Sequence, residues 1–122
     1  MNNYHVVGKP IPKLDAAKKA MGRAEYIQDM KIPEMLYGKI LYSKYAHAKI
    51  NKIDISKAKA LPGVHAVLTG DDVPDTMKMG FYMDNPPIKK DKVCSFRDEV
   101  AAVTATSPEI AKKAIDLIEI EY

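Results

Sequence analysis

The chain has 122 residues, of which 47% are hydrophobic and 29% charged, and its net charge is +3. This length suits one domain with a single modest core, and this balance of residues is typical of an ordered globular protein. No apolar run approaches the ~20 residues that a membrane-spanning helix needs. Residues 1–9 lack the apolar stretch of a secretory signal. We therefore expect a cytoplasmic protein without a membrane partner.

The basic residues do not indicate nucleic-acid binding. Lysines occur in every segment, the longest basic run is two residues, and no aromatic side chains interleave with them as base-stacking platforms would. Cys94 is the single cysteine, so the chain forms no internal disulfide, which is consistent with a reducing compartment. We interpret Cys94 as a half-buried strand residue, because free cysteine behaves mostly as a small hydrophobic side chain. A nucleophile is the alternative.

Residues 1–21 are interpreted as an N-terminal arm. Pro10 and Pro12 favour an extended backbone around them. Asp15 is placed to cap a short helical turn that runs through Met21 and ends at Gly22.

Two strands and one helical turn are predicted next. Residues 35–42 are rich in Tyr, Ile and Leu and lack proline, which is typical of a strand. The stretch 49–55 is also predicted to be a strand, but its isoleucines do not alternate cleanly, so we expect a bulge or bend near Asn51. Ser56 is predicted to cap one helical turn over 57–61, which Pro62-Gly63 ends.

A third strand over 64–69 is followed by a turn at 70–74, where aspartates can accept hydrogen bonds from nearby backbone amides. Residues 75–91 are predicted to form a long loop. Its soft apolar side chains either pack down on the core or contact a partner, and we favour packing on the core. These side chains are Met77, Met79, Phe81 and Met83.

The last third of the chain holds the clearest elements. Strands are predicted at 92–96 and 99–105, and the second is apolar on both faces, so we expect it in the middle of a sheet with cover on both sides. A helix follows, capped either by Thr106 with Glu109 or by Ser107 with Pro108 at the first helical position. Residues 119–122 alternate as a final strand. Strands with one good helix and one or two short ones indicate an α+β fold.

The residues alone reveal no active site. His5, His47 and His65 lie far apart, and none has a second metal ligand at a recognisable spacing. The pairs 71–72 and 98–99 are acidic, but neighbouring strand residues point to opposite faces, so turn and edge roles are expected. The six glycines form no phosphate-binding motif, and there is no nucleophile elbow. We predict no catalytic, cofactor-binding or metal-binding residue.

Several short motifs in one order nevertheless resemble a known family. They begin with Gly22-Arg23-Ala24-Glu25-Tyr26, Asp29, Pro33 and Met35-Leu36-Tyr37-Gly38, and continue with Ser43-Lys44-Tyr45-Ala46-His47-Ala48-Lys49-Ile50, Ile53-Asp54, Ala60-Leu61-Pro62-Gly63-Val64, Ala66-Val67-Leu68-Thr69, Asp72-Val73-Pro74 and Val100-Ala101-Ala102-Val103. Over roughly residues 6–122 they resemble the molybdenum-binding subunit of the xanthine dehydrogenase/aldehyde oxidase family. Each motif alone is weak, but their shared order and spacing are specific.

The resemblance implies that residues 1–122 are a single α/β hammerhead domain, a bent, mostly antiparallel or mixed sheet with packed helices, at the N-terminus of a longer subunit. It implies a parent oxidoreductase that hydroxylates an N-heterocycle or aldehyde with oxygen from water. Its molybdopterin would lie in later domains, and its [2Fe-2S] clusters and FAD on other domains or separate subunits. This domain would be structural and inactive alone, with the remaining domains of the subunit as its partners.

This sequence departs from the family pattern at three turns. Pro33-Glu34 stands where Pro-Gly is usual, Lys44 where proline is common, and residues 96–99 replace a glycine-containing turn. The alternative interpretation is a free-standing small protein-interaction module without enzymatic role, which would use the Met-rich loop 77–83.

Overall fold

The computed structural model describes residues 4–122, which fall into two compact units, up to Pro33 and from Glu34 to Tyr122. The first unit contains the helix α1 (Ala16–Ala20) and the 3-10 turn η1 (Ile27–Asp29), and neither buries a residue. Asp15 precedes α1 as predicted, but its side chain does not cap the helix. The Asp15 carboxylate makes no capping hydrogen bond and instead pairs with Lys19 at 2.5 Å. Gly22, with φ of 66°, ends the turn as predicted.

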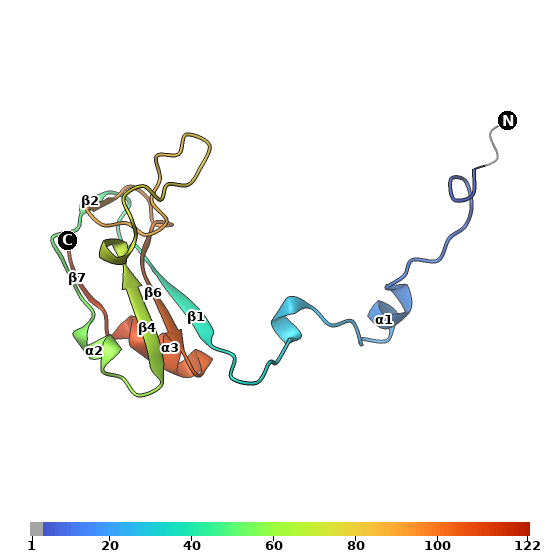
Figure 1. The fold of residues 1–122 in the computed structure, drawn as a ribbon, viewed down its shortest axis with the longest axis horizontal. Helices are drawn as coiled ribbons and strands as arrows, with labels where there is room; N and C mark the ends of the chain where they lie inside the picture. The colour runs from blue at the N-terminus through green and yellow to red at the C-terminus, as the bar shows by residue number, and fades with distance from the viewer. Residues whose placement is uncertain (1–3) are drawn as a thin grey trace. The chain divides into compact units, whose positions relative to one another are not determined.

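The second unit is built on a three-stranded antiparallel sheet (Figure 1). Its strands are β1 (Tyr37–Tyr42), β6 (Glu99–Ala105) and β4 (Val64–Thr69), in the order β1-β6-β4. Every strand pair in the described residues is antiparallel. The predicted central position of β6 is therefore confirmed, and the α+β fold class is confirmed with it.

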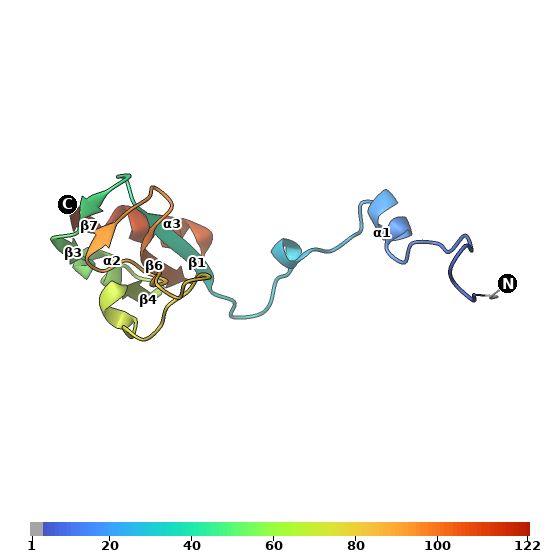
Figure 2. The ribbon, with the colours of Figure 1, turned by 90° about the horizontal axis from the view of Figure 1, so that it is seen from above.

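Helix α3 (Pro108–Asp116) packs across one face of this sheet (Figures 1 and 2), together with α2 (Ser56–Lys59). Of the two predicted caps for α3, the structure forms the second. The Ser107 hydroxyl accepts a hydrogen bond from the Ile110 amide at 3.3 Å, and Pro108 occupies the first turn. The helix turns its apolar side to the sheet, and Ala111, Ala114 and Ile115 are buried.

The core lies between these helices and the odd-numbered residues of β6. Ala101 and Val103 are fully buried and share one cluster with Val67, Ala58, Ala114, Ile115 and Ile118. Alanine on both the strand and the helix allows the two backbones to approach closely.

The opposite face of the sheet is not covered by other residues of the second unit. Ala102 on β6 pairs with Ile40 on β1 and with Leu68 on β4, and these two flanking side chains are 43% and 46% exposed. The expectation of cover on both faces of β6 is therefore wrong for residues 34–122, because both packed helices lie on the same side.

The predicted strand at 49–55 is divided between two small sheets. β2 (Ala48–Lys49) pairs with β5 (Lys92–Val93), and β3 (Lys52–Asp54) pairs with β7 (Glu119–Glu121). The break falls at the expected place near Asn51: the Ile50 amide donates to Asp91 O and the Asn51 amide donates to Glu121 O, both at 2.8 Å.

Two local predictions around these strands are wrong. Ser56 does not cap α2 but is its first residue; its amide and hydroxyl donate to Asp54 Oδ1 at 2.9 and 2.6 Å. The strand predicted for 92–96 ends at Val93, because the Cys94 amide turns away to donate to Asp98 Oδ2 at 2.6 Å. The strand at the C-terminus is confirmed.

Candidate functional site

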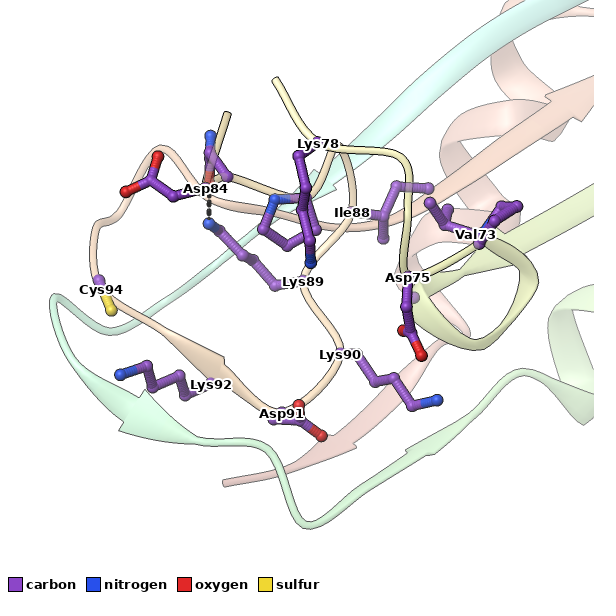
Figure 3. A pocket seen from close by; sticks show the side chains of 14 residues that line it. Val73, Asp75, Lys78, Asp84, Ile88, Lys89, Lys90, Asp91, Lys92 and Cys94 are labelled. Carbon is purple, nitrogen blue, oxygen red and sulfur yellow. Dashed lines mark hydrogen bonds between the residues drawn. The ribbon is translucent and has the colours of Figure 1, made fainter. Parts of the chain in front are cut away.

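A cavity of about 630 Å³ lies between Gly70 and the long loop that leads to β5 (Figure 3). The loop is held against the sheet by the Lys89 amide, which donates to Glu99 O at 2.7 Å. Gly70 permits this approach, since a Cβ built there would lie 2.7 Å from Lys90 Cα. The cavity wall thus depends on a backbone contact that only glycine allows.

Two of the lysines at this cavity are neutralised by structural partners. Lys89 Nζ donates to Asn85 Oδ1 and lies 3.8 Å from Asp98, in a largely buried position. Lys90 Nζ lies 2.9 Å from Asp71, and this hydrogen bond raises the pKa of the Lys90 ammonium.

The remaining charged groups of the cavity are of both signs. Lys78 and Lys92 face Asp75, Asp84 and Asp91 around the opening (Figure 3). A wall of mixed charge favours neither an anion nor a cation, and no nucleophile here is hydrogen-bonded to a base, as activation requires. The geometry therefore indicates a solvated hollow of mixed charge.

The acidic pairs have the structural roles that the sequence predicted. Asp72 Oδ2 accepts from the Thr69 amide at 2.7 Å and from its hydroxyl at 3.1 Å, closing the 3-10 turn η2 (Gly70–Asp72). These hydrogen bonds hold the pKa of Asp72 below its usual range. Asp98 orders the turn after β5 through the Cys94 amide.

Two predictions about exposed groups are wrong. Cys94 is exposed just beyond β5 and is not a half-buried strand residue. The apolar side chains of the long loop do not pack on the core: Phe81 is 94% exposed and Tyr82 82%. They stand on a small hairpin closed by two backbone hydrogen bonds between Met79 and Asn85.

Sequence reasoning also missed a buried phenol. The Tyr122 ring makes an edge contact with Tyr45 at 4.9 Å between centroids. Its hydroxyl is buried beside Ser43 and the Lys44 backbone, and among residues 4–122 it forms no hydrogen bond of standard geometry. Burial raises the pKa of this phenol. No local pattern signals such a group, because the residues around it come from distant parts of the chain.

The described residues contain no group of three His, Cys, Asp or Glu side chains close enough to share a metal ion. Within the same range, no helix has the length and apolar character needed to cross a membrane. The three histidines lie in separate segments, as the sequence suggested, with His65 on β4 and His47 in the bend before β2.

The domain with this fold matches a family model over residues 21–122, described as "Aldehyde oxidase and xanthine dehydrogenase, a/b hammerhead domain". The chain belongs to this family. The resemblance inferred from the ordered motifs is confirmed.

Among curated proteins, the chain is 39% identical over 121 residues to the "Nicotinate dehydrogenase large molybdopterin subunit" of Eubacterium barkeri, a match that covers 98% of this chain and 28% of that protein. It is 37% identical over 118 residues to the "Xanthine dehydrogenase/oxidase" of Rattus norvegicus, a match that covers 96% of this chain and 9% of that protein. The chain thus spans less than a third of the length of either relative.

Among solved structures, the chain matches carbon monoxide dehydrogenase from Oligotropha carboxidovorans with a TM-score of 0.84 and 37% identity. The match covers 94% of this chain and 15% of that one. These relatives are oxidoreductases. The lining of this cavity does not fit a molybdopterin site, because Lys89 and Lys90 are engaged by Asp98 and Asp71 and no cluster of metal ligands lies among residues 4–122.

Proposed function

We propose that this chain is the non-catalytic N-terminal structural domain of a molybdopterin-dependent hydroxylase. The family match over residues 21–122 carries the proposal, and the mixed charge of the cavity beside Gly70 supports it. In this proposal residues 1–122 form one domain, and no catalytic, cofactor-binding or metal-binding residue lies in it. The relatives' names favour an N-heterocycle as the parent enzyme's substrate, and the description of the family adds an aldehyde.

The parent enzyme would hold molybdopterin in later domains of the same subunit, with [2Fe-2S] clusters and FAD on other domains or on separate subunits, in the cytoplasm. The role of this domain is then structural: it packs against the other domains of the enzyme and helps to hold them in place. Its rigid core of β6 and α3 suits such a role, because a packed interior transmits position without needing reactive groups.

The proposal is tested by metal analysis and by assays with xanthine and nicotinate. The 122-residue chain should hold no stoichiometric molybdenum and show no turnover, whereas the larger subunit that contains it should show both. Stoichiometric molybdenum in the 122-residue chain, or turnover by it, would contradict the proposal.

A second candidate function is a free-standing interaction module, favoured by the exposed apolar hairpin that carries Phe81 and Tyr82. The coding sequence after Tyr122 separates the two functions. Several hundred further codons support the enzyme, and an immediate stop codon in an intact operon supports the module.

A further inference from the structure

The N-terminal segment, defined as residues 4–33, has an apolar surface that its own unit does not cover. Each of its large apolar side chains is at least half exposed, with Leu14 at 103%, Ile27 at 85% and Val7 at 72%. No residue of α1 or η1 is buried. Ordering a chain costs about 1–2 kcal/mol per residue, and that loss must be offset by burial that this unit lacks.

The segment nevertheless carries specific local structure. Gly22 adopts a positive φ after α1, and at η1 the Tyr26 amide donates to Asp29 Oδ2 at 3.0 Å. Caps and turns of this kind define a shape without supplying stability. The segment therefore has the features of an element that is shaped locally and stabilised by contact with another surface.

The charge of the segment indicates what kind of surface that is. Residues 1–33 contain six basic and three acidic side chains, whereas residues 34–122 contain thirteen of each, so the whole net charge of +3 lies at the N-terminus. Among the described residues of the segment, Lys19 is paired with Asp15, and no ion pair engages Lys13, Lys18 or Arg23. A groove with apolar walls and a carboxylate-rich rim complements this pattern.

The comparisons indicate where such a groove lies. The match to carbon monoxide dehydrogenase covers 94% of this chain, and so includes most of the segment, yet it accounts for only 15% of that chain. The match is thus a small part of that polypeptide, and the proposed function places further domains of the same polypeptide after this one. A membrane surface is a poorer fit, because α1 is a five-residue helix and binding at a membrane interface requires a longer amphipathic one.

We propose that the N-terminal segment docks in an apolar, acid-rimmed groove on the part of the same polypeptide that follows Tyr122, and so ties this domain to the later domains. The proposal rests on the proposed function and adds to it the residues that make the connection. Leu14 and Ile27 enter the groove, and Lys13, Lys18 and Arg23 face its rim.

Photo-crosslinking in the complete large subunit tests the occupant. Benzoylphenylalanine replaces Leu14 or Ile27, with Lys112 on the exposed side of α3 as the control position, and mass spectrometry locates each crosslink. Crosslinks from 14 and 27 to residues beyond 122 of the same chain are expected. Crosslinks to residues 34–122, to a second copy, to another subunit or to lipid would each overturn the proposal, as would no crosslink at all.

Molybdenum content and turnover are measured on the same preparation, so that the two proposals fail in different ways. A subunit with molybdenum and turnover whose crosslinks fall elsewhere overturns only the docking. A preparation without either overturns the proposed function and the docking together.

A second measurement tests whether the basic residues of the segment contact the acidic rim of the groove. Chymotrypsin cleavage after Tyr26 should become several-fold faster in the subunit when Lys18→Glu places a carboxylate at the rim, and faster again with Ile27→Asp. Lys44→Glu, a reversal outside the segment, and Ile27→Val should leave the rate unchanged. Equal rates in all four variants would show that the segment is not held.

Discussion

Residues 34–122 bury twelve apolar side chains, whereas the described residues of the N-terminal segment bury none, although both regions are rich in Ile, Leu, Val and Met. In residues 34–122, the spacing of the apolar residues along the sequence accounts for their burial. The apolar residues of α3 and β6 recur on one side of a helix or alternate along a strand, so they can meet within one domain. The apolar side chains of the segment are not buried within their own unit.

The largest expected effect separates these two regions directly. Val103→Asp places an unpaired carboxylate in the core between β6 and α3, and should destabilise the 122-residue chain by about 4 kcal/mol or more. Ile27→Asp is the matched change in the segment and should leave the midpoint of urea denaturation unchanged. A similar loss in both variants would mean that the segment packs on residues 34–122 after all.

Gly70→Ala should give the next largest effect. The added Cβ would meet the backbone of Lys90, so β4 and the long loop must move apart, at a cost of about 1–3 kcal/mol. Gly38→Ala is the control, because nothing lies within 4 Å of a Cβ at that position. Urea denaturation of both variants measures the difference, and equal midpoints would contradict the close contact.

Ser107→Ala should destabilise the second unit by about 1 kcal/mol, since the Ile110 amide loses its acceptor at the start of α3. Ser107→Asp retains an acceptor and should restore most of that loss. Thr106→Ala distinguishes the two caps that the sequence allowed: if it destabilises the protein as much as Ser107→Ala, the alternative cap forms in solution.

The turn after β4 should make the free energy of unfolding depend on pH in the acidic range. Asp72 has a pKa lowered in the folded state, first by the Thr69 amide and then by the Thr69 hydroxyl. Its contribution is therefore present above the unfolded pKa near 3.8 and is lost as the pH falls through the lower, folded pKa.

Asp72→Asn should thus lower the free energy of unfolding at pH 7, by less than the loss from Ser107→Ala, and flatten its decline below pH 4. Asp116→Asn, whose pairing with Lys112 is exposed, is the control. Parallel acid profiles for wild type and Asp72→Asn would contradict the role of the carboxylate.

The smallest expected effect is a gain. Tyr122→Phe removes a buried hydroxyl that forms no hydrogen bond of standard geometry among the described residues, and should stabilise the protein by up to about 1 kcal/mol. Tyr45→Phe changes an exposed ring that contacts it and should be neutral. A loss of stability in Tyr122→Phe would show that the hydroxyl is hydrogen-bonded in solution.

The sequence predicted the elements whose signals are local. The both-sided apolar pattern of β6 predicted its central place, and the spacing of Ile110, Ala114 and Ile118 predicted α3. It predicted the bend near Asn51 but not that the two halves of that strand join separate sheets, because the partners of Ile50 and Asn51 are Asp91 and Glu121, far along the chain. Hydrogen-bond partners so far apart in sequence do not affect the local periodicity of apolar residues.

The exposed hairpin and the open face of the sheet escaped prediction for a related reason. The long loop and both faces of the sheet were expected to pack within the chain, but Phe81 and Leu68 are exposed. Composition shows that a side chain is apolar and does not show which surface covers it. For the candidate site, the structural roles of Asp72 and Asp98 followed from turn chemistry. The cavity beside Gly70 did not, since it depends on the approach of the loop to β4.

The pairing of β3 with β7 has a consequence for synthesis in the cell. Lys57, just after β3, is joined to Glu119 on β7 across 62 residues of sequence. A ribosome must therefore release nearly the whole of residues 34–122 before this pair can close, while β1, β4 and β6 are free to associate earlier. During that interval the half-finished domain exposes an unpaired strand edge, which a chaperone could recognise.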